Sequence, residues 1–205
     1  MEHIKDLESG SSPKIRKAAN NIFKKKSGGY CTHLIRALNK EIGKPKAWKT
    51  QCQLIKAIAV TDCIAALPTL KQLIEREYDS TILYKELGFA IFILENTKKM
   101  NLDFLYQSIE KGNELQICGA CAGVLFKKAI PPKEDIRKII SGISKYTENE
   151  GCIITPRCYI AAIAHLWPKE ETTEFLESCK NSQWSGLVDI SSNALQSIES
   201  QIKLI

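Results

Sequence analysis

Apolar residues recur every three or four positions along almost the whole chain, and no segment shows a sustained alternation of apolar and polar residues. This spacing places apolar side chains on one face of an α-helix, whereas alternation would indicate a β-strand. Two helix-start signals agree, because Ser12-Pro13 and Thr155-Pro156 each pair a capping hydroxyl with a proline suited to the first helical turn. The pattern therefore predicts an all-α protein.

Alternate predicted helices align with one another, which indicates a repeat. The helices are short, about 10 to 17 residues, and glycine and proline breaks separate them at 27–29, 43–45, 130–132 and 167–168. The aligned segments are spaced by 33, 35, 34, 41 and 32 residues and begin at Pro13, Lys46, Thr81, Leu115, Pro156 and Val188. Self-similarity with a period of about 20 to 50 residues is typical of stacked helical hairpins.

The alignment contains three columns, each four residues after the one before. The first is mostly bulky and consists of Ile15, Trp48, Leu83, Ile117, Cys158 and Ile190. The second is mostly small and consists of Ala19, Cys52, Leu87, Cys121, Ala162 and Ala194. In the third column, which is again apolar, only Lys56 departs from the pattern.

Two segments resemble the helices of HEAT repeats. PKIRKAANNIF at 13–23 resembles the second helix, where a proline, a basic residue and small residues recur. AALPTLKQLIERE at 65–77 resembles the first helix, which often carries a proline inside it, such as Pro68. The resemblance to this armadillo-like superfamily implies one domain over residues 1–205, built as a right-handed α-solenoid of about five to six hairpins. It implies macromolecule binding through the concave helix layer and assigns no active site.

A non-repetitive helical bundle is the alternative fold, because heptad-like spacing can produce such columns by chance. Either fold suits the composition, which has 44% hydrophobic and 25% charged residues, as expected of a folded soluble protein. The N-terminal segment MEHIKDLESG lacks a secretion signal, and the longest apolar run, at 89–94, is too short to span a bilayer. We therefore expect a cytoplasmic protein without membrane contact, whose eight cysteines are reduced and buried.

Cys118 and Cys121 have the Cys-x-x-Cys spacing of metal and redox sites. A structural zinc site needs a second ligand pair, and a redox pair opens a helix after a strand, so neither reading fits this mid-helix pair. We interpret the motif as helix packing, with Cys121 buried and Cys118 on a surface. His165 is interpreted as a core residue, and Cys31 beside His33 lacks a visible orienting group for catalysis. We expect no catalytic residue, metal or cofactor.

The net charge of +6 is concentrated at the N-terminal end. Residues 1–56 contain 13 basic and 4 acidic residues, whereas residues 57–205 contain 16 basic and 19 acidic residues. Phosphates or an acidic protein could bind this basic end. The alternative interpretation is a solvated helix face, since exposed lysines are ordinary.

The column that follows the bulky column would project in one direction from successive hairpins. With two adjacent lysines it forms the predicted partner-binding strip, which consists of Arg16, Lys17, Lys49, Tyr84, Lys85, Cys118 and Tyr159. Charge would lie at one end of this strip and aromatic side chains at the other.

Repetition along the chain without a catalytic constellation favours a non-enzymatic protein-binding function, as an adaptor or an inhibitor or immunity-type protein. The alternative is nucleic-acid binding through the basic N-terminal repeats. One family of DNA-alkylation-repair glycosylases is built from similar repeats and uses an aspartate with aromatic residues, but its own motifs do not match this chain. The aromatic candidates here are Trp48, Trp167, Trp184, Tyr84 and Tyr159. An enzyme site assembled from distant loops stays open, because fold does not fix function.

Overall fold

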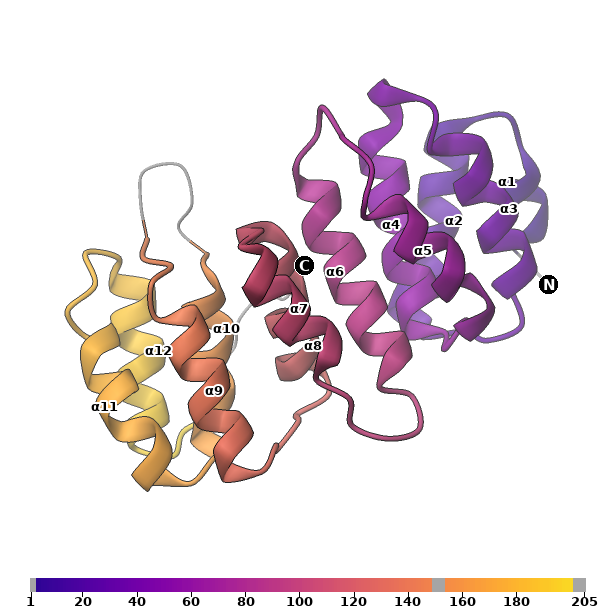
Figure 1. Cartoon of the computed structure of the whole chain (residues 1–205). Coiled ribbons are helices and arrows are strands. Elements are labelled where there is room, and N and C mark those ends of the chain that lie inside the picture. Colours follow the sequence, from indigo (N-terminus) through magenta and orange to yellow (C-terminus); the bar gives the residue numbers. More distant parts are fainter. Residues whose placement is uncertain (1–2, 149–153, 201–205) are drawn as a thin grey trace. The chain divides into compact units, whose positions relative to one another are not determined.

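The computed structural model describes residues 3–148 and 154–200 and is helical throughout these ranges (Figure 1). No strand occurs among the described residues, so the all-α prediction is confirmed. The chain divides into two compact units, Met1–Asn101 and Leu102–Ile205. None of the helices in the described ranges is long and apolar enough to cross a membrane.

The first unit contains six α-helices and two short 3-10 helices among its described residues. They are α1 (Ile4–Glu8), α2 (Ser12–Lys25), α3 (Cys31–Glu41), η1 (Pro45–Ala47), α4 (Trp48–Val60), η2 (Ile64–Ala66), α5 (Leu67–Leu73) and α6 (Ile82–Glu95). Helix α4 packs against both α2 and α6, while α1 contacts α2 and α3, α3 contacts α4, and α5 packs on α6. Alternate helices therefore form one layer of this unit, and the helices between them cover it (Figure 1).

The second unit repeats this arrangement. Its described elements are α7 (Asp103–Lys111), α8 (Glu114–Phe126), α9 (Lys133–Ile143), α10 (Pro156–Ile163), η3 (Ala164–Leu166), α11 (Lys169–Cys179) and α12 (Ser185–Leu195). Helix α10 packs against α8 and α12, whereas α7, α9 and α11 make the contacts of the second layer. The six aligned segments of the sequence thus fall on α2, α4, α6, α8, α10 and α12.

The small column is the part of the aligned repeat whose residues are most consistently buried in the core. All six of its residues, from Ala19 to Ala194, are buried. Cys121 is fully buried on α8, as predicted, among small residues that let the neighbouring helices approach. In the bulky column only Trp48 departs from burial, with 36% of its surface exposed.

Lys56, the exception in the third column, is explained by a partner on the neighbouring helix. Its ammonium group lies 3.5 Å from the Glu86 carboxylate of α6, and both side chains are largely buried. Burial raises the pKa of Glu86, and this effect outweighs the opposing effect of the nearby lysines. The ion pair therefore joins α4 to α6 at a position where the other aligned segments carry an apolar residue.

The resemblance to HEAT repeats implied that Pro68 lies inside a longer helix. In the structure, Pro68 lies in the first turn of α5. Residues 64–66 form η2 instead, and α5 starts at Leu67. A proline in the first turn gives up no helical hydrogen bond, because the N–H groups there have no partner within the helix. The covering helix α5 is consequently shorter than the helix that the sequence predicted over residues 65–77.

Cys31 and Cys63 form a disulfide, so the expectation that all cysteines are reduced is wrong for this pair. Their Cα atoms lie 5.3 Å apart, and they are separated by 32 residues, close to the repeat spacing. The bond therefore links the start of α3 to the start of η2 in the following hairpin. Disulfides are rare in cytosolic proteins, which weighs against the expected cytoplasmic location.

The free cysteines of the described ranges are all buried: Cys52, Cys118, Cys121, Cys158 and Cys179. Burial raises the pKa of Cys52 to about 12 and that of Cys158 to about 11. Thiols with raised pKa values hold little nucleophilic thiolate at neutral pH, so these cysteines act as packing residues. Cys152 lies outside the described residues.

We expect reduction of the Cys31 to Cys63 disulfide to destabilise the first unit by about 3 to 4 kcal/mol, because a closed loop of this length restricts the unfolded chain. Urea unfolding with and without reductant measures the difference. The Cys31→Ala/Cys63→Ala variant is the matched control, and reductant should not change its unfolding midpoint. An unchanged wild-type midpoint after reduction would contradict the prediction.

Candidate binding site

The structure brings two of the predicted strip residues together at one cavity. Arg16 of α2 and Lys49 of α4 are both exposed and line one cavity. Lys17 is exposed on α2, whereas Tyr84 and Lys85 of α6 are half-buried. The Tyr84 hydroxyl donates to the Arg76 carbonyl oxygen at 2.8 Å, so this side chain holds the loop before α6.

Cys118 and Tyr159 do not belong to any surface, and their predicted place in the strip is wrong. Cys118 is 1% exposed, with its thiol 3.6 Å from the Ile154 carbonyl oxygen, and Tyr159 is fully buried. Helices α8 and α10 are buried on nearly every side, so the column that faces solvent on α2 and α4 is covered in the second unit. The strip is therefore reduced to its members in the first unit.

The cavity beside Arg16 and Lys49 has a volume of about 500 Å³, and we call it the basic cavity. It lies at the N-terminal ends of α2 and α4, next to the connection that follows α3. Its lining consists of Ser12, Pro13, Arg16, Lys44, Lys46, Ala47, Trp48, Lys49 and Thr50. Four of these nine residues are basic, and none is acidic.

Most of the positive charge around the basic cavity is not neutralised. Lys44 donates to the Glu41 carboxylate at 2.5 Å. Within the part of the chain that the structure describes, no carboxylate forms an ion pair with Arg16, Lys46 or Lys49. The Lys49 ammonium instead lies 5.2 Å from the centre of the Trp48 ring, a distance typical of a cation–π contact. The cavity is therefore an electropositive site with one aromatic wall.

Glu41 does not line the cavity, but its carboxylate binds two residues that do, and we call it the floor residue. Its side chain is buried and accepts a hydrogen bond of 2.5 Å from the Ser12 hydroxyl as well as the one from Lys44. Thr50 adds a second link, because its hydroxyl donates to the Ser12 carbonyl oxygen at 3.2 Å. A buried charge is stable only when it is paired and hydrogen-bonded. The first turns of α2 and α4 are consequently held against the end of α3.

Ser12 therefore does not cap its helix as predicted. Helix α2 starts one residue earlier than expected, with Ser11 at the N-cap, and the Ser12 hydroxyl serves Glu41. At the second predicted cap, Thr155 does occupy the N-cap of α10, but its hydroxyl donates to Glu148 at 2.9 Å. In both units, the hydroxyl group that the sequence predicted to cap a helix backbone instead donates its hydrogen bond to a buried glutamate.

Gln51 fixes the connection that carries Lys44 and Lys46. Its side-chain amide is buried and donates to the carbonyl oxygens of Glu41 at 2.7 Å and of Lys44 at 2.9 Å. The same two carbonyl oxygens also accept the backbone N–H groups of Lys44 and Ala47, both at 2.9 Å, so the amide adds a second donor to each. The lysines of the basic cavity therefore project from a connection whose backbone is held in place.

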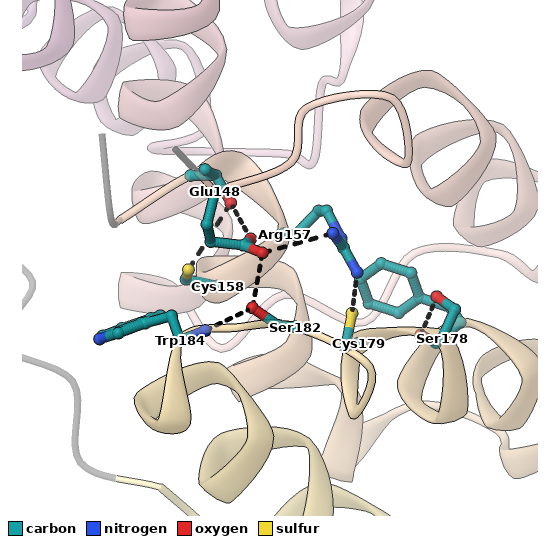
Figure 2. Close-up of polar contacts among 9 residues, drawn as sticks. Glu148, Arg157, Cys158, Ser178, Cys179, Ser182 and Trp184 are labelled. Carbon is teal, nitrogen blue, oxygen red and sulfur yellow. Dashed lines mark hydrogen bonds and ion pairs between the residues drawn. The ribbon is translucent and has the colours of Figure 1, made fainter. Parts of the chain in front are cut away.

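The second unit contains a buried polar centre around Arg157 and Glu148 (Figure 2). The two side chains are 8% and 9% exposed, with 3.5 Å between their nearest charged atoms. Glu148 also accepts a hydrogen bond of 2.8 Å from Ser182, and Arg157 donates to the Cys179 sulfur at 3.4 Å. Figure 2 shows Arg157 reaching between Glu148 and Cys179, which joins the segments before α10 and after α11.

This centre has the chemistry of a structural network. Burial raises the pKa values of Cys158 and Cys179, and for Cys179 it outweighs the lowering effect of Arg157. Neither thiol is thereby activated as a nucleophile. The polar groups satisfy one another, so the centre explains how the second unit is held together and offers no vacant position for a substrate.

The histidines likewise form no reactive group. His33 lies 3.0 Å from Glu8, and its neighbour Cys31 is in the disulfide. His165 is half-buried, with Nδ1 2.7 Å from the Ala162 carbonyl oxygen. Among the described residues, no group of three or more His, Cys, Asp or Glu side chains is arranged to hold a metal ion.

Sequence reasoning found Arg16 and Lys49 but missed Lys44, Lys46 and Trp48 as members of the same site. A usable signal was present, because KPKAWK at 44–49 places three lysines and a tryptophan directly after a helix break. The floor residue Glu41 had no such signal, since a single glutamate near a helix end resembles any solvated residue. No protein-family model matches this chain, and neither a curated protein nor a solved structure is significantly similar to it.

We expect Gln51→Met to lower the free energy of unfolding by about 1 to 3 kcal/mol, because it removes the two hydrogen bonds that the buried amide donates to the Glu41 and Lys44 carbonyl oxygens. Gln53→Met is the matched control, since the Gln53 side-chain nitrogen is buried without a hydrogen-bond partner. Its loss should be neutral or stabilising. Equal losses in urea unfolding of the two variants would show that the hydrogen bonds of Gln51 contribute nothing.

We expect Arg157→Met to cost about 3 to 5 kcal/mol, because it leaves the buried Glu148 carboxylate without its cation. The double variant Glu148→Gln/Arg157→Met should recover part of that loss. Lys133→Met is the surface control, since Lys133 pairs with Glu170 and both side chains are more than half exposed; exposed pairs contribute little. Thermal and urea unfolding measure all three variants, and similar losses for Arg157→Met and Lys133→Met would contradict a buried centre.

Proposed function

We propose that the chain is a non-enzymatic binding protein that holds an acidic segment of a partner protein in the basic cavity. The observation that carries this proposal is the set of three cations, Arg16, Lys46 and Lys49, that line one cavity and have no carboxylate partner within residues 3–148 and 154–200. Electrostatic complementarity of this kind selects partners and speeds their association.

The proposed architecture behind this function is the HEAT-like α-solenoid, in which alternate helices form one continuous binding layer. Packing of α4 on α2 and α6, and of α10 on α8 and α12, supports it within each unit. Extended surfaces of this type bind macromolecules in adaptor and inhibitor proteins. One domain over residues 1–205 and the cytoplasmic location stay predictions, and the disulfide weighs against the latter.

A second candidate is nucleic-acid binding, favoured by the exposed Trp48 beside the cations of the basic cavity. Bases stack on aromatic side chains while lysines and arginines contact phosphates. The glycosylase version of this hypothesis loses two of its aromatic candidates, because Trp167 and Tyr159 are buried. Protein binding is therefore the first proposal, and nucleic acid is an outcome that the test separates.

We expect a tagged wild-type chain to recover a stoichiometric protein partner from native lysate, and Arg16→Glu/Lys49→Glu to lose it. Reversing two charges at the basic cavity should repel an acidic segment. Lys24→Glu/Lys25→Glu is the matched control, because it makes the same change in net charge at the far end of α2 and should retain the partner.

Nuclease treatment of the lysate distinguishes the two candidates. Recovery that survives nuclease and fails only in the cavity variant supports protein binding. Recovery that disappears with nuclease, and falls steeply with salt, would replace the first proposal with the second. Equal recovery by both double variants would place the binding surface elsewhere.

A further inference from the structure

We infer that the basic cavity recognises a phosphorylated side chain on the partner's segment, and not carboxylates alone. The inference rests on the proposed protein-binding function and names the chemical group that the cavity selects. It starts from the charge balance of the cavity, in which Lys44 is paired with Glu41 while Arg16, Lys46 and Lys49 form no ion pair with any residue that the structure describes.

Three unpaired cations around one cavity match a dianion better than a single carboxylate. A phosphorylated serine or threonine carries a charge of about −1.5 to −2 at neutral pH and offers three acceptor oxygens. A carboxylate carries one charge and two oxygens, so it would leave part of the positive charge uncompensated. The charge of the cavity therefore fits a phosphomonoester.

The donors also differ in kind, as phosphate recognition requires. The Arg16 guanidinium group offers parallel N–H donors that match two phosphate oxygens, whereas Lys46 and Lys49 act as mobile point charges. The first turns of α2 and α4 border the same cavity, and the ends of helix dipoles there favour an anion. These helix ends add to the side-chain donors and do not define the site by themselves.

The floor limits where the anion can lie. Glu41 is a buried carboxylate whose oxygens are already occupied by Ser12 and Lys44. A phosphate close to Glu41 would be repelled, so we place it at the rim, between Arg16 and the two unpaired lysines. The cavity volume of about 500 Å³ exceeds that of one phosphoryl group and leaves the wall formed by Trp48 for apolar atoms of the bound segment.

A nucleic-acid backbone fits this arrangement less well. Each phosphodiester carries one negative charge, and affinity comes from many contacts distributed along the strand. The cations of the basic cavity instead line a single cavity of limited volume. The observations thus favour a phosphorylated protein segment over DNA or RNA.

The test uses three immobilised peptide libraries with random flanking residues and phosphoserine, glutamate or serine at the centre. We expect the wild-type chain to bind the phosphoserine library about tenfold more tightly than the glutamate library, since the phosphoryl group has a third acceptor oxygen and one further charge-assisted hydrogen bond corresponds to about that factor. Binding to the serine library should be weaker still. Arg16→Lys keeps the charge but removes the parallel donors, so it should weaken phosphoserine binding several-fold, while Lys24→Glu/Lys25→Glu should not.

Each other outcome overturns the inference in a distinguishable way. Equal binding of the phosphoserine and glutamate libraries would leave an acidic-segment site without phosphate selectivity, so the proposed function would stand and the inference would fall. The same holds if phosphatase treatment of the lysate leaves recovery of the partner unchanged. Failure of all three libraries, or stronger binding of a DNA duplex that Arg16→Glu/Lys49→Glu abolishes, would overturn the inference.

Discussion

A buried carboxylate in each unit fixes the position of the helices around it. Glu41 accepts from Ser12 and Lys44, and Glu148 accepts from Thr155 and Ser182 and pairs with Arg157. Removing a carboxylate from water is costly, so each of these two carboxylates is stable only because donors within the protein replace water. The donors come from segments up to 34 residues away in sequence, and each carboxylate therefore sets how the hairpins of its unit meet.

The basic cavity depends on the first of these carboxylates. Glu41 neutralises Lys44 and holds the start of α2, while Gln51 holds the backbone between α3 and η1. Among the described residues, Arg16, Lys46 and Lys49 have no carboxylate partner, and Lys49 contacts only the face of the Trp48 ring, so these cations stay available to a ligand. A site with a fixed backbone and charged side chains at its edge is preorganised, because binding then orders only the side chains. The same buried network thus supports both the fold of the first unit and the proposed function.

The fold was predictable from the sequence where the same packing position recurs in successive helices. Residues of the small column lie at helix contacts in every hairpin, so their size is visible as a pattern, and burial follows it from Ala19 to Ala194. The neighbouring column failed as a surface strip, because Cys118 and Tyr159 lie on helices that are covered nearly all round. A residue such as cysteine or tyrosine can lie in the core or on the surface, and the sequence does not decide between them when the neighbouring helices are unknown. A charged residue such as Arg16 or Lys49 favours the surface.

The sequence by itself determined the helical period, the alternation of packing helices and the basic character of the N-terminal third, because these depend on local spacing and composition. Only the tertiary structure decided which charges are paired, which are free, and which cysteines are bonded. Ser12 meets Glu41 across 29 residues, and Cys31 meets Cys63 across 32. Such pairings depend on the distance between separate hairpins, which spacing along one helix does not specify.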